Sequence, residues 1–181
     1  MNKAYATWAA RWRVPLGFAL GIAYLAFSQP TTLALSLGGG LALLGLAIRG
    51  LAAGCLEKDR TLATGGPYRY SRNPLYLGSF LMGIGFAFAG GSWWLGIIFL
   101  VFFLGVYWPV MRREEDFLRA KFGNAYDDYA RRVALFLPRP ARALQPGKGF
   151  HWVRYRQNRE YEAALGFAAM LLFLLAKMKL R

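Results

Sequence analysis

The sequence predicts an all-α membrane protein, a polytopic bundle of about five transmembrane helices with short amphipathic helices on its cytoplasmic side. Hydrophobic residues make up 56% of the 181 residues and charged residues 18%, whereas charged residues fill about a quarter of a soluble domain. Charged residues are also absent from residues 14–48, 73–111 and 163–176. Since one helix needs about 20 residues to cross the hydrocarbon core, the chain can cross and return within each of the first two stretches.

Turn signals divide these stretches into individual helices. Residues 28–31, Ser-Gln-Pro-Thr, break the first stretch because proline cannot continue a helix. Residues 90–92, Gly-Gly-Ser, break the second, and Trp93 and Trp94 follow as an interfacial anchor. The predicted spans are residues 14–29, 31–52, 75–90, 93–111 and 161–177. Five crossings would place the two termini on opposite sides of the membrane.

Basic residues flank the same ends of these spans, which is the positive-inside pattern of a cytoplasmic face. They are Lys3, Arg11, Arg13, Lys58, Arg60, Arg69, Arg72 and the arginines between residues 112 and 159. We therefore expect the N-terminus and both large loops in the cytoplasm, and an inner membrane of bacterial or archaeal type. Lys177, Lys179 and Arg181 contradict the pattern, unless the last helix does not cross fully.

The composition also bears on partners and metals. The net charge of +14 would suit a nucleic-acid partner, but the basic residues are not gathered with stacking aromatics on a soluble domain, so we expect no nucleic acid. The single Cys55 excludes an internal disulfide, and the single His151 excludes a histidine-rich metal site. We expect no metal and no obligatory protein partner.

Residues 65–78 form a polar turn that leads into the third span. Gly65 to Tyr68 have the composition of a tight turn that holds the next residues against the membrane face. Asn73 is a favourable N-cap and Pro74 a favourable first helical residue, so local physics already explains the pair. The free amides of a helix start also attract an anion, and Arg69 and Arg72 stand beside them.

Glu114 and Glu115 follow the fourth span, on the same side as the polar turn if the chain crosses and returns. One interpretation is a solvated helix start in which Glu115 pairs with Arg119. The other is a carboxylate that faces the bundle and binds a cation or a ribose diol. Adjacent helical residues point about 100° apart, so we expect one of the two to face inward. Pro109 should splay the last turn of this span and open room beside the pair.

A pair of amphipathic helices is predicted beyond the fourth span. Gly123 and Asn124 should end the first and cap the second, with Asn124 and Asp127 at capping spacing. An apolar stripe at helical intervals favours packing against the bundle over contact with a ligand. The stripe consists of Tyr126, Tyr129, Val133 and Phe136.

Together, these segments resemble the isoprenylcysteine carboxyl methyltransferase and phospholipid N-methyltransferase family. The resemblance runs from about Thr61 to Pro140 and depends on the order and spacing of five pieces. They are residues 66–68, 72–78, 114–115, 122–129 and 137–139. The resemblance implies an integral-membrane enzyme that uses S-adenosylmethionine without a Rossmann domain. Many members carry His where this chain has Asn73, and an amide cannot act as a base at neutral pH.

The predicted spans and the resemblance together give the expected domains, and the resemblance implies site residues. We expect one membrane domain over residues 1–181, with an N-terminal hairpin (1–55), a cofactor-binding catalytic core (61–140) and a basic linker with the last helix (141–181). The expected cofactor-binding residues are Tyr68, Arg72, Asn73, Tyr76, Leu77, Gly78, Glu114, Glu115, Tyr126 and Tyr129. The expected catalytic residues are Arg69, Glu115 and Arg132. In this assignment Arg72 and the helix start hold the cofactor carboxylate.

The expected acceptor is a lipid-like amphiphile that enters from the bilayer. A carboxylate acceptor needs an arginine and no base, whereas an amine must lose a proton to a carboxylate or a tyrosine. The sequence offers both, so O- and N-methylation stay open. Two other functions are considered: an NADPH-dependent membrane reductase related to sterol reductases, and a non-enzymatic membrane scaffold.

Overall fold

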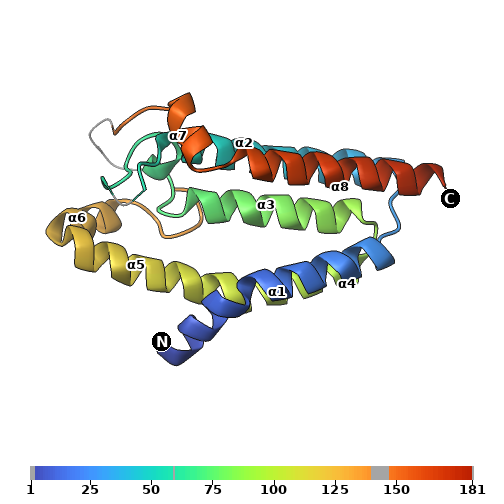
Figure 1. Ribbon diagram of the computed structural model, residues 1–181, viewed down its shortest axis with the longest axis horizontal. Helices are drawn as coiled ribbons and strands as arrows, with labels where there is room; N and C mark the ends of the chain where they lie inside the picture. The colour runs from blue at the N-terminus through green and yellow to red at the C-terminus, as the bar shows by residue number, and fades with distance from the viewer. Residues whose placement is uncertain (1–2, 59, 140–146, 181) are drawn as a thin grey trace.

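The computed structural model describes residues 3–58, 60–139 and 147–180. Within these ranges the secondary structure is helical, apart from one isolated parallel bridge between Ser71 and Ala134 (Figure 1). The helices in chain order are α1 (Lys3–Phe27), α2 (Thr32–Cys55), α3 (Pro74–Ala89), α4 (Trp93–Phe102), α5 (Trp108–Phe122), α6 (Asn124–Arg132), α7 (Trp152–Gln157) and α8 (Tyr161–Lys179). The predicted all-α class is confirmed.

In Figure 1, α3 lies between α2 and α8 on one side and α1, α4 and α5 on the other, and α3 contacts both α2 and α4. Helix α1 begins at one end of the bundle and α8 ends at the other. Among the described residues, three helices are long and apolar enough to cross a membrane: α2, the continuous helix Trp93–Phe122, and α8. Helix α3 is apolar but has only 16 residues, and α1 carries Arg11 and Arg13. The polytopic class is confirmed, and crossing by α1 and α3 stays a prediction.

The predicted turns lie where the helices end. Thr31 caps α2, since its hydroxyl accepts a hydrogen bond from the amide of Ala34 at 3.2 Å. The turn between α1 and α2 contacts the turn between α3 and α4, because the amide of Gln29 donates a hydrogen bond to the carbonyl of Gly90 at 2.5 Å. Helix α1 starts eleven residues earlier than the predicted span, at Lys3 instead of Val14.

Pro109 does not splay the fourth helix, and this expectation is wrong. Helix α4 continues through a π-helical segment, η2 (Phe103–Tyr107), into α5, so the helix runs unbroken to Phe122. The wider π turn makes room for the proline ring. The carbonyl of Gly105, four residues before Pro109, accepts a hydrogen bond from the Tyr5 hydroxyl at 2.7 Å instead.

Helices α2 and α3 pack at close range through glycines. A Cβ atom at Gly38 would lie 2.4 Å from the carbonyl oxygen of Gly85, and one at Gly45 would lie 2.5 Å from that of Gly78. Side chains at these positions would push the helices apart. This contact brings the last turns of α2 beside the first turns of α3.

Lys177 explains part of the exception to the positive-inside pattern. Its ammonium group donates to the carbonyl oxygens of Leu25 and Ala26, at 2.6 and 3.2 Å, and to the Ser28 hydroxyl at 3.2 Å. A cation is favourable at the C-terminus of a helix, where carbonyl groups lack partners. Lys177 therefore joins α8 to the end of α1, and Arg181 lies outside the described residues.

Candidate functional site

A cavity of about 460 Å³ lies at the end of the bundle where α3 begins. Residues of α1, α2, α3, α5, α6 and the approach to α8 contribute to its wall. Seven of the ten predicted cofactor-binding residues line it: Tyr68, Arg72, Asn73, Tyr76, Glu114, Tyr126 and Tyr129. The polar turn and the acidic segment therefore meet at one cavity, as the sequence predicts.

The polar turn of residues 65–78 begins with a 3-10 helix, η1 (Gly66–Arg69), in which Tyr68 is buried against α2. Its left-handed first residue, Gly66 with φ of 53°, allows the chain to reverse. The Tyr129 hydroxyl of α6 donates to the carbonyl of Tyr68 at 2.7 Å. The amide of Arg72 donates to the carbonyl of Ala134 at 2.8 Å, so the segment after α6 fixes the start of α3.

The capping roles expected for two asparagines are wrong. Asn73 occupies the N-cap position of α3, but its side chain makes no capping hydrogen bond and donates to the carbonyl of Leu135 at 3.0 Å. Asn124 is the first residue of α6, and Gly123, with φ of 54°, takes the cap position because glycine tolerates this conformation. The Asp127 carboxylate accepts from Arg119 at 2.8 Å.

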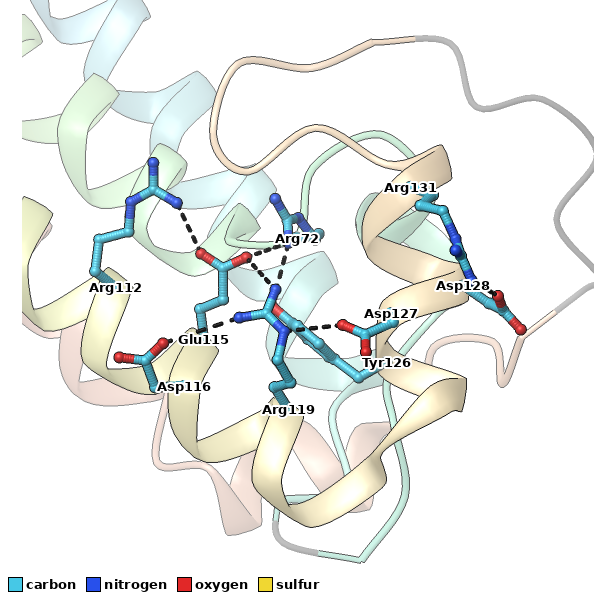
Figure 2. Close-up of polar contacts among 9 residues, drawn as sticks. All are labelled: Arg72, Arg112, Glu115, Asp116, Arg119, Tyr126, Asp127, Asp128 and Arg131. Atoms are coloured by element: carbon cyan, nitrogen blue, oxygen red, sulfur yellow. Dashed lines mark hydrogen bonds and ion pairs between the residues drawn. The ribbon is translucent and has the colours of Figure 1, made fainter.

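Glu115 is the centre of a cluster of arginines (Figure 2). The guanidinium of Arg72 donates to its carboxylate at 2.6 Å, that of Arg112 at 2.9 Å and that of Arg119 at 3.4 Å. Only 11% of the Arg72 side chain and 7% of the Glu115 side chain are exposed. Arg72 also donates to the Tyr126 hydroxyl at 3.4 Å. The Glu115 carboxylate therefore compensates the positive charge of these three arginines. Glu115 also lines a second hollow, of about 480 Å³.

Glu114, in contrast, lines the first cavity, where it interacts with the Tyr76 hydroxyl of α3. Glu114 is an exposed residue that lines the cavity, so a ligand there can reach its side chain. As adjacent helical positions predict, one member of the acidic pair faces the cavity and the other does not. Arg72 lines both hollows.

Some predicted site residues lie away from both hollows. Arg69 and Arg132 are exposed and line neither hollow. Leu77 is buried outside the cavity wall, and Gly78 packs against α2, where a Cβ atom would lie 2.6 Å from the carbonyl oxygen of Gly45. The motif residues Leu77 and Gly78 thus position α3, while their neighbours face the cavity.

The sequence reasoning missed a polar group on the part of the cavity wall that contains Arg49 and Ser79, which we call the inner wall. Arg49 of α2 pairs with Glu160, which precedes α8, through two hydrogen bonds of 2.5 and 3.0 Å. Its third contact is with the hydroxyl of Ser79 on α3. The available signal was Arg49 itself, a charged residue inside a predicted span, because such residues mark functional sites by default.

The fold and the cavity define a class, a helical membrane protein with a polar, ligand-sized cavity at one end of its bundle. Residues 42–125 match the phospholipid methyltransferase family. The matched segment contains the polar turn, α3, the acidic pair and the start of α6. This match confirms the family resemblance that the motifs indicate.

Three relatives match the chain over 82 or 83 residues. The chain is 38% identical over 83 residues to the nickel-cobalt-cadmium resistance protein NccN of Alcaligenes xylosoxydans xylosoxydans. It is 35% identical over 83 residues to the cobalt-zinc-cadmium resistance protein CzcN of Cupriavidus metallidurans. Each of these two matches covers 46% of this chain and 38% of the relative. It is 29% identical over 82 residues to a protein-S-isoprenylcysteine O-methyltransferase of Schizosaccharomyces pombe, covering 45% of this chain and 35% of that protein. The chain thus matches little more than a third of each relative's length. No solved structure gives a significant match.

Proposed function

We propose that the protein transfers the methyl group of S-adenosylmethionine to an amphiphilic acceptor in the membrane. The observation that carries this proposal is the meeting of the polar turn, Glu114 and the tyrosines of α6 at one cavity, within the segment that matches the phospholipid methyltransferase family. The identity to an isoprenylcysteine O-methyltransferase supports the same activity.

The residues of the cavity fit this cofactor. Pockets for small molecules measure roughly 300–1,000 Å³, and this cavity has about 460 Å³. Glu114 would accept hydrogen bonds from the ribose or the amino group, and the faces of Tyr76 and Tyr126 would favour a sulfonium cation. Arg72 Nε is a buried donor with no acceptor among the described residues, which is the kind of group that a bound carboxylate satisfies.

Position and exclusion of water are the tasks left to the protein. When bound, S-adenosylmethionine supplies an electrophilic methyl group, so neither a metal nor a covalent nucleophile is needed. Tyr126 and Tyr129 are buried where they line the cavity, so they would help to keep water from that part of it. Asn73 is unsuited to act as a base, since its amide does not titrate near neutral pH and already donates to Leu135.

The proposed acceptor is the carboxylate of a lipidated or isoprenoid thiol compound, or a phospholipid amine. It would enter from the bilayer, and the cofactor would enter from the cytoplasm, with the catalytic face on the cytoplasmic side of an inner membrane. Neither nucleic acid nor an obligatory protein partner is part of this proposal.

Cofactor binding tests the proposal directly. Titration of the purified full-length protein in detergent micelles with S-adenosylhomocysteine should give saturable heat. Glu114→Gln should weaken this binding at least about tenfold, or roughly 1.4 kcal/mol, because the ribose or amino group loses a charged acceptor. Asp116→Asn is the matched control, since this carboxylate lies two residues away and its side chain is 81% exposed.

The other two functions predict different titrations. Tight NADPH binding without a response to S-adenosylhomocysteine would favour the reductase. A scaffold would bind neither molecule, and Glu114→Gln would then behave like the control.

A further inference from the structure

We propose that Arg49 receives the anionic head group of the acceptor and that Glu160 holds the Arg49 guanidinium in place until the acceptor binds. This inference rests on the proposed function and narrows its acceptor to an amphiphile with a carboxylate or a similar oxyanion. It assigns acceptor binding to the inner wall of the cavity, in place of Arg69 and Arg132, which line neither hollow.

The geometry of Arg49 leaves it able to bind a second anion. Its Nε and Nη2 atoms donate to the two carboxylate oxygens of Glu160 at 2.5 and 3.0 Å, and Nη1 contacts the Ser79 hydroxyl. A guanidinium has more N–H groups than these three contacts use. The Arg49 side chain is 24% exposed, while that of Glu160 is 5% exposed. Both residues line the cavity, and Arg49 is the more exposed of the two.

The backbone around Glu160 directs its carboxylate inward. Arg159, just before it, has a φ of 54°, a conformation that residues other than glycine rarely adopt. The Asn158 amide donates to the carbonyls of Ala53 and Leu56, at 2.9 and 3.0 Å, which holds this turn against the end of α2. Strain of this kind persists where the surrounding contacts fix it, and it concentrates at functional sites.

Stability alone does not account for this ion pair. Both charges must leave water, and replacing a buried pair by apolar side chains is often neutral or stabilising. Arg49 lies six residues before the end of α2 and Ser79 five residues beyond the start of α3, so both stand about 8 Å inward from the helix ends. A charged group at this depth in an apolar bundle is a functional-site candidate.

The depth of Arg49 also separates it from the cofactor groups. Arg72 and Glu114 lie at the polar end of the cavity, near the start of α3 and beyond the apolar part of the fourth helix. An amphiphile that enters from the bilayer would reach Arg49 first with its head group, while its chain stays between the helices. Arriving there, an oxyanion would compete with Glu160 for the same N–H groups.

Head-group preference tests this assignment. Tritiated oleate and tritiated methyl oleate would be bound to the purified full-length protein on scintillation beads in detergent. Wild type should prefer oleate at least about tenfold, and Arg49→Gln should remove this preference. Glu160→Gln should raise oleate affinity because it removes the competing carboxylate, whereas a purely structural role would lower the binding of both ligands. Arg156→Gln is the matched control, since Arg156 is exposed on α7.

The outcomes separate this inference from the proposed function. S-adenosylhomocysteine titration of Arg49→Gln should match wild type, and a selective loss of that binding would overturn the inference by assigning Arg49 to the cofactor. An oleate preference that survives in Arg49→Gln would also overturn it. If that variant aggregates, the charge-neutral pair Arg49→Gln with Glu160→Gln decides, since the inference requires it to show no preference. A third outcome separates the two proposals: wild type prefers oleate, Arg49→Gln loses this preference, and wild type does not bind S-adenosylhomocysteine. That result would reject the methyltransferase function and leave the role of Arg49 in anion binding intact.

Discussion

Glu114 and Glu115 are neighbours whose carboxylates have different surroundings. Glu115 accepts from Arg72, Arg112 and Arg119, whereas Glu114 borders the cavity beside Tyr76. The first carboxylate compensates buried positive charge, and the second is open to a ligand. Substitutions at these two positions should therefore change different properties of the protein.

Glu115→Gln should destabilise the fold. The change leaves the mostly buried guanidinium of Arg72 without its charged partner, which costs about 3 kcal/mol for a buried ion pair. Unfolding titrations in detergent micelles measure this loss, and Asp116→Asn should stay within about 0.5 kcal/mol of wild type. A Glu115→Gln protein as stable as wild type would show that the arginine cluster does not depend on this carboxylate.

Glu57 gives the loop after α2 a dependence on pH. Its hydrogen bond with Lys148, opposed by desolvation and aided by the charge of Arg154, holds the pKa of this carboxyl below its ordinary value near 4.5. A lowered pKa means that the contact stabilises the protein at neutral pH and is lost as the pH falls through the folded-state pKa. Protection factors of the amides of residues 147–154, which correct for the intrinsic effect of pH on exchange, should fall in that range, and Glu57→Gln should remove this change. Protection factors that are equal at pH 7 and at a pH below the folded-state pKa would contradict this prediction.

At the scale of helices, the α2 and α3 contact determines the shape of the cavity. Gly45 and Gly78 allow the two backbones to approach, and this approach brings Arg49 to Ser79. The pair of helices thus supplies one wall of the cavity.

Gly45→Val should separate these helices. A Cβ atom at Gly45 would lie 2.5 Å from the carbonyl oxygen of Gly78, and overpacking of this kind costs about 2 kcal/mol. Gly40→Val is the matched control, because a Cβ atom there meets nothing within 4 Å among the described residues. Unfolding titrations compare the two variants. Equal stability of the two would mean that α2 and α3 can move apart without loss.

The sequence predicted the helices better than their contacts. Apolar runs and turn residues are local, so they located the long helices and the meeting of the polar turn with Glu114. The partner of Arg49 lies 111 residues away, at Glu160, and no local pattern records such a pair. Asn73 was misjudged for the same reason, because the Leu135 carbonyl that binds its amide is remote in sequence. Local rules also missed the π turn, in which the Gly105 carbonyl accepts a hydrogen bond from the distant Tyr5 of α1.

For the whole molecule, the contacts of Lys177 place the end of α8 beside the end of α1. The start of α8 lies near the cavity, through Glu160 and Arg49. These two contacts fix the direction of α8 relative to the other helices. If α2 crosses the membrane, then α8, which runs antiparallel to it, should cross as well.

Cysteine labelling checks this topology. In a Cys55→Ser background, Lys58→Cys and Leu180→Cys are both exposed positions. A membrane-impermeant maleimide should label Lys58→Cys in inverted bacterial vesicles and Leu180→Cys in right-side-out vesicles. Labelling of both from one side would show that the last helix does not cross.

The unbroken helix from Trp93 to Phe122 has a consequence for the lipid that surrounds the protein. Its 30 residues extend about 45 Å, whereas the hydrocarbon core measures about 30 Å. If this helix crosses along the membrane normal, about three turns, including the acidic pair, project into water as a continuation of the same helix. Acyl-chain length would then adjust how far this helix emerges, so bilayer thickness should tune the reach between a water-borne donor and a lipid-borne recipient.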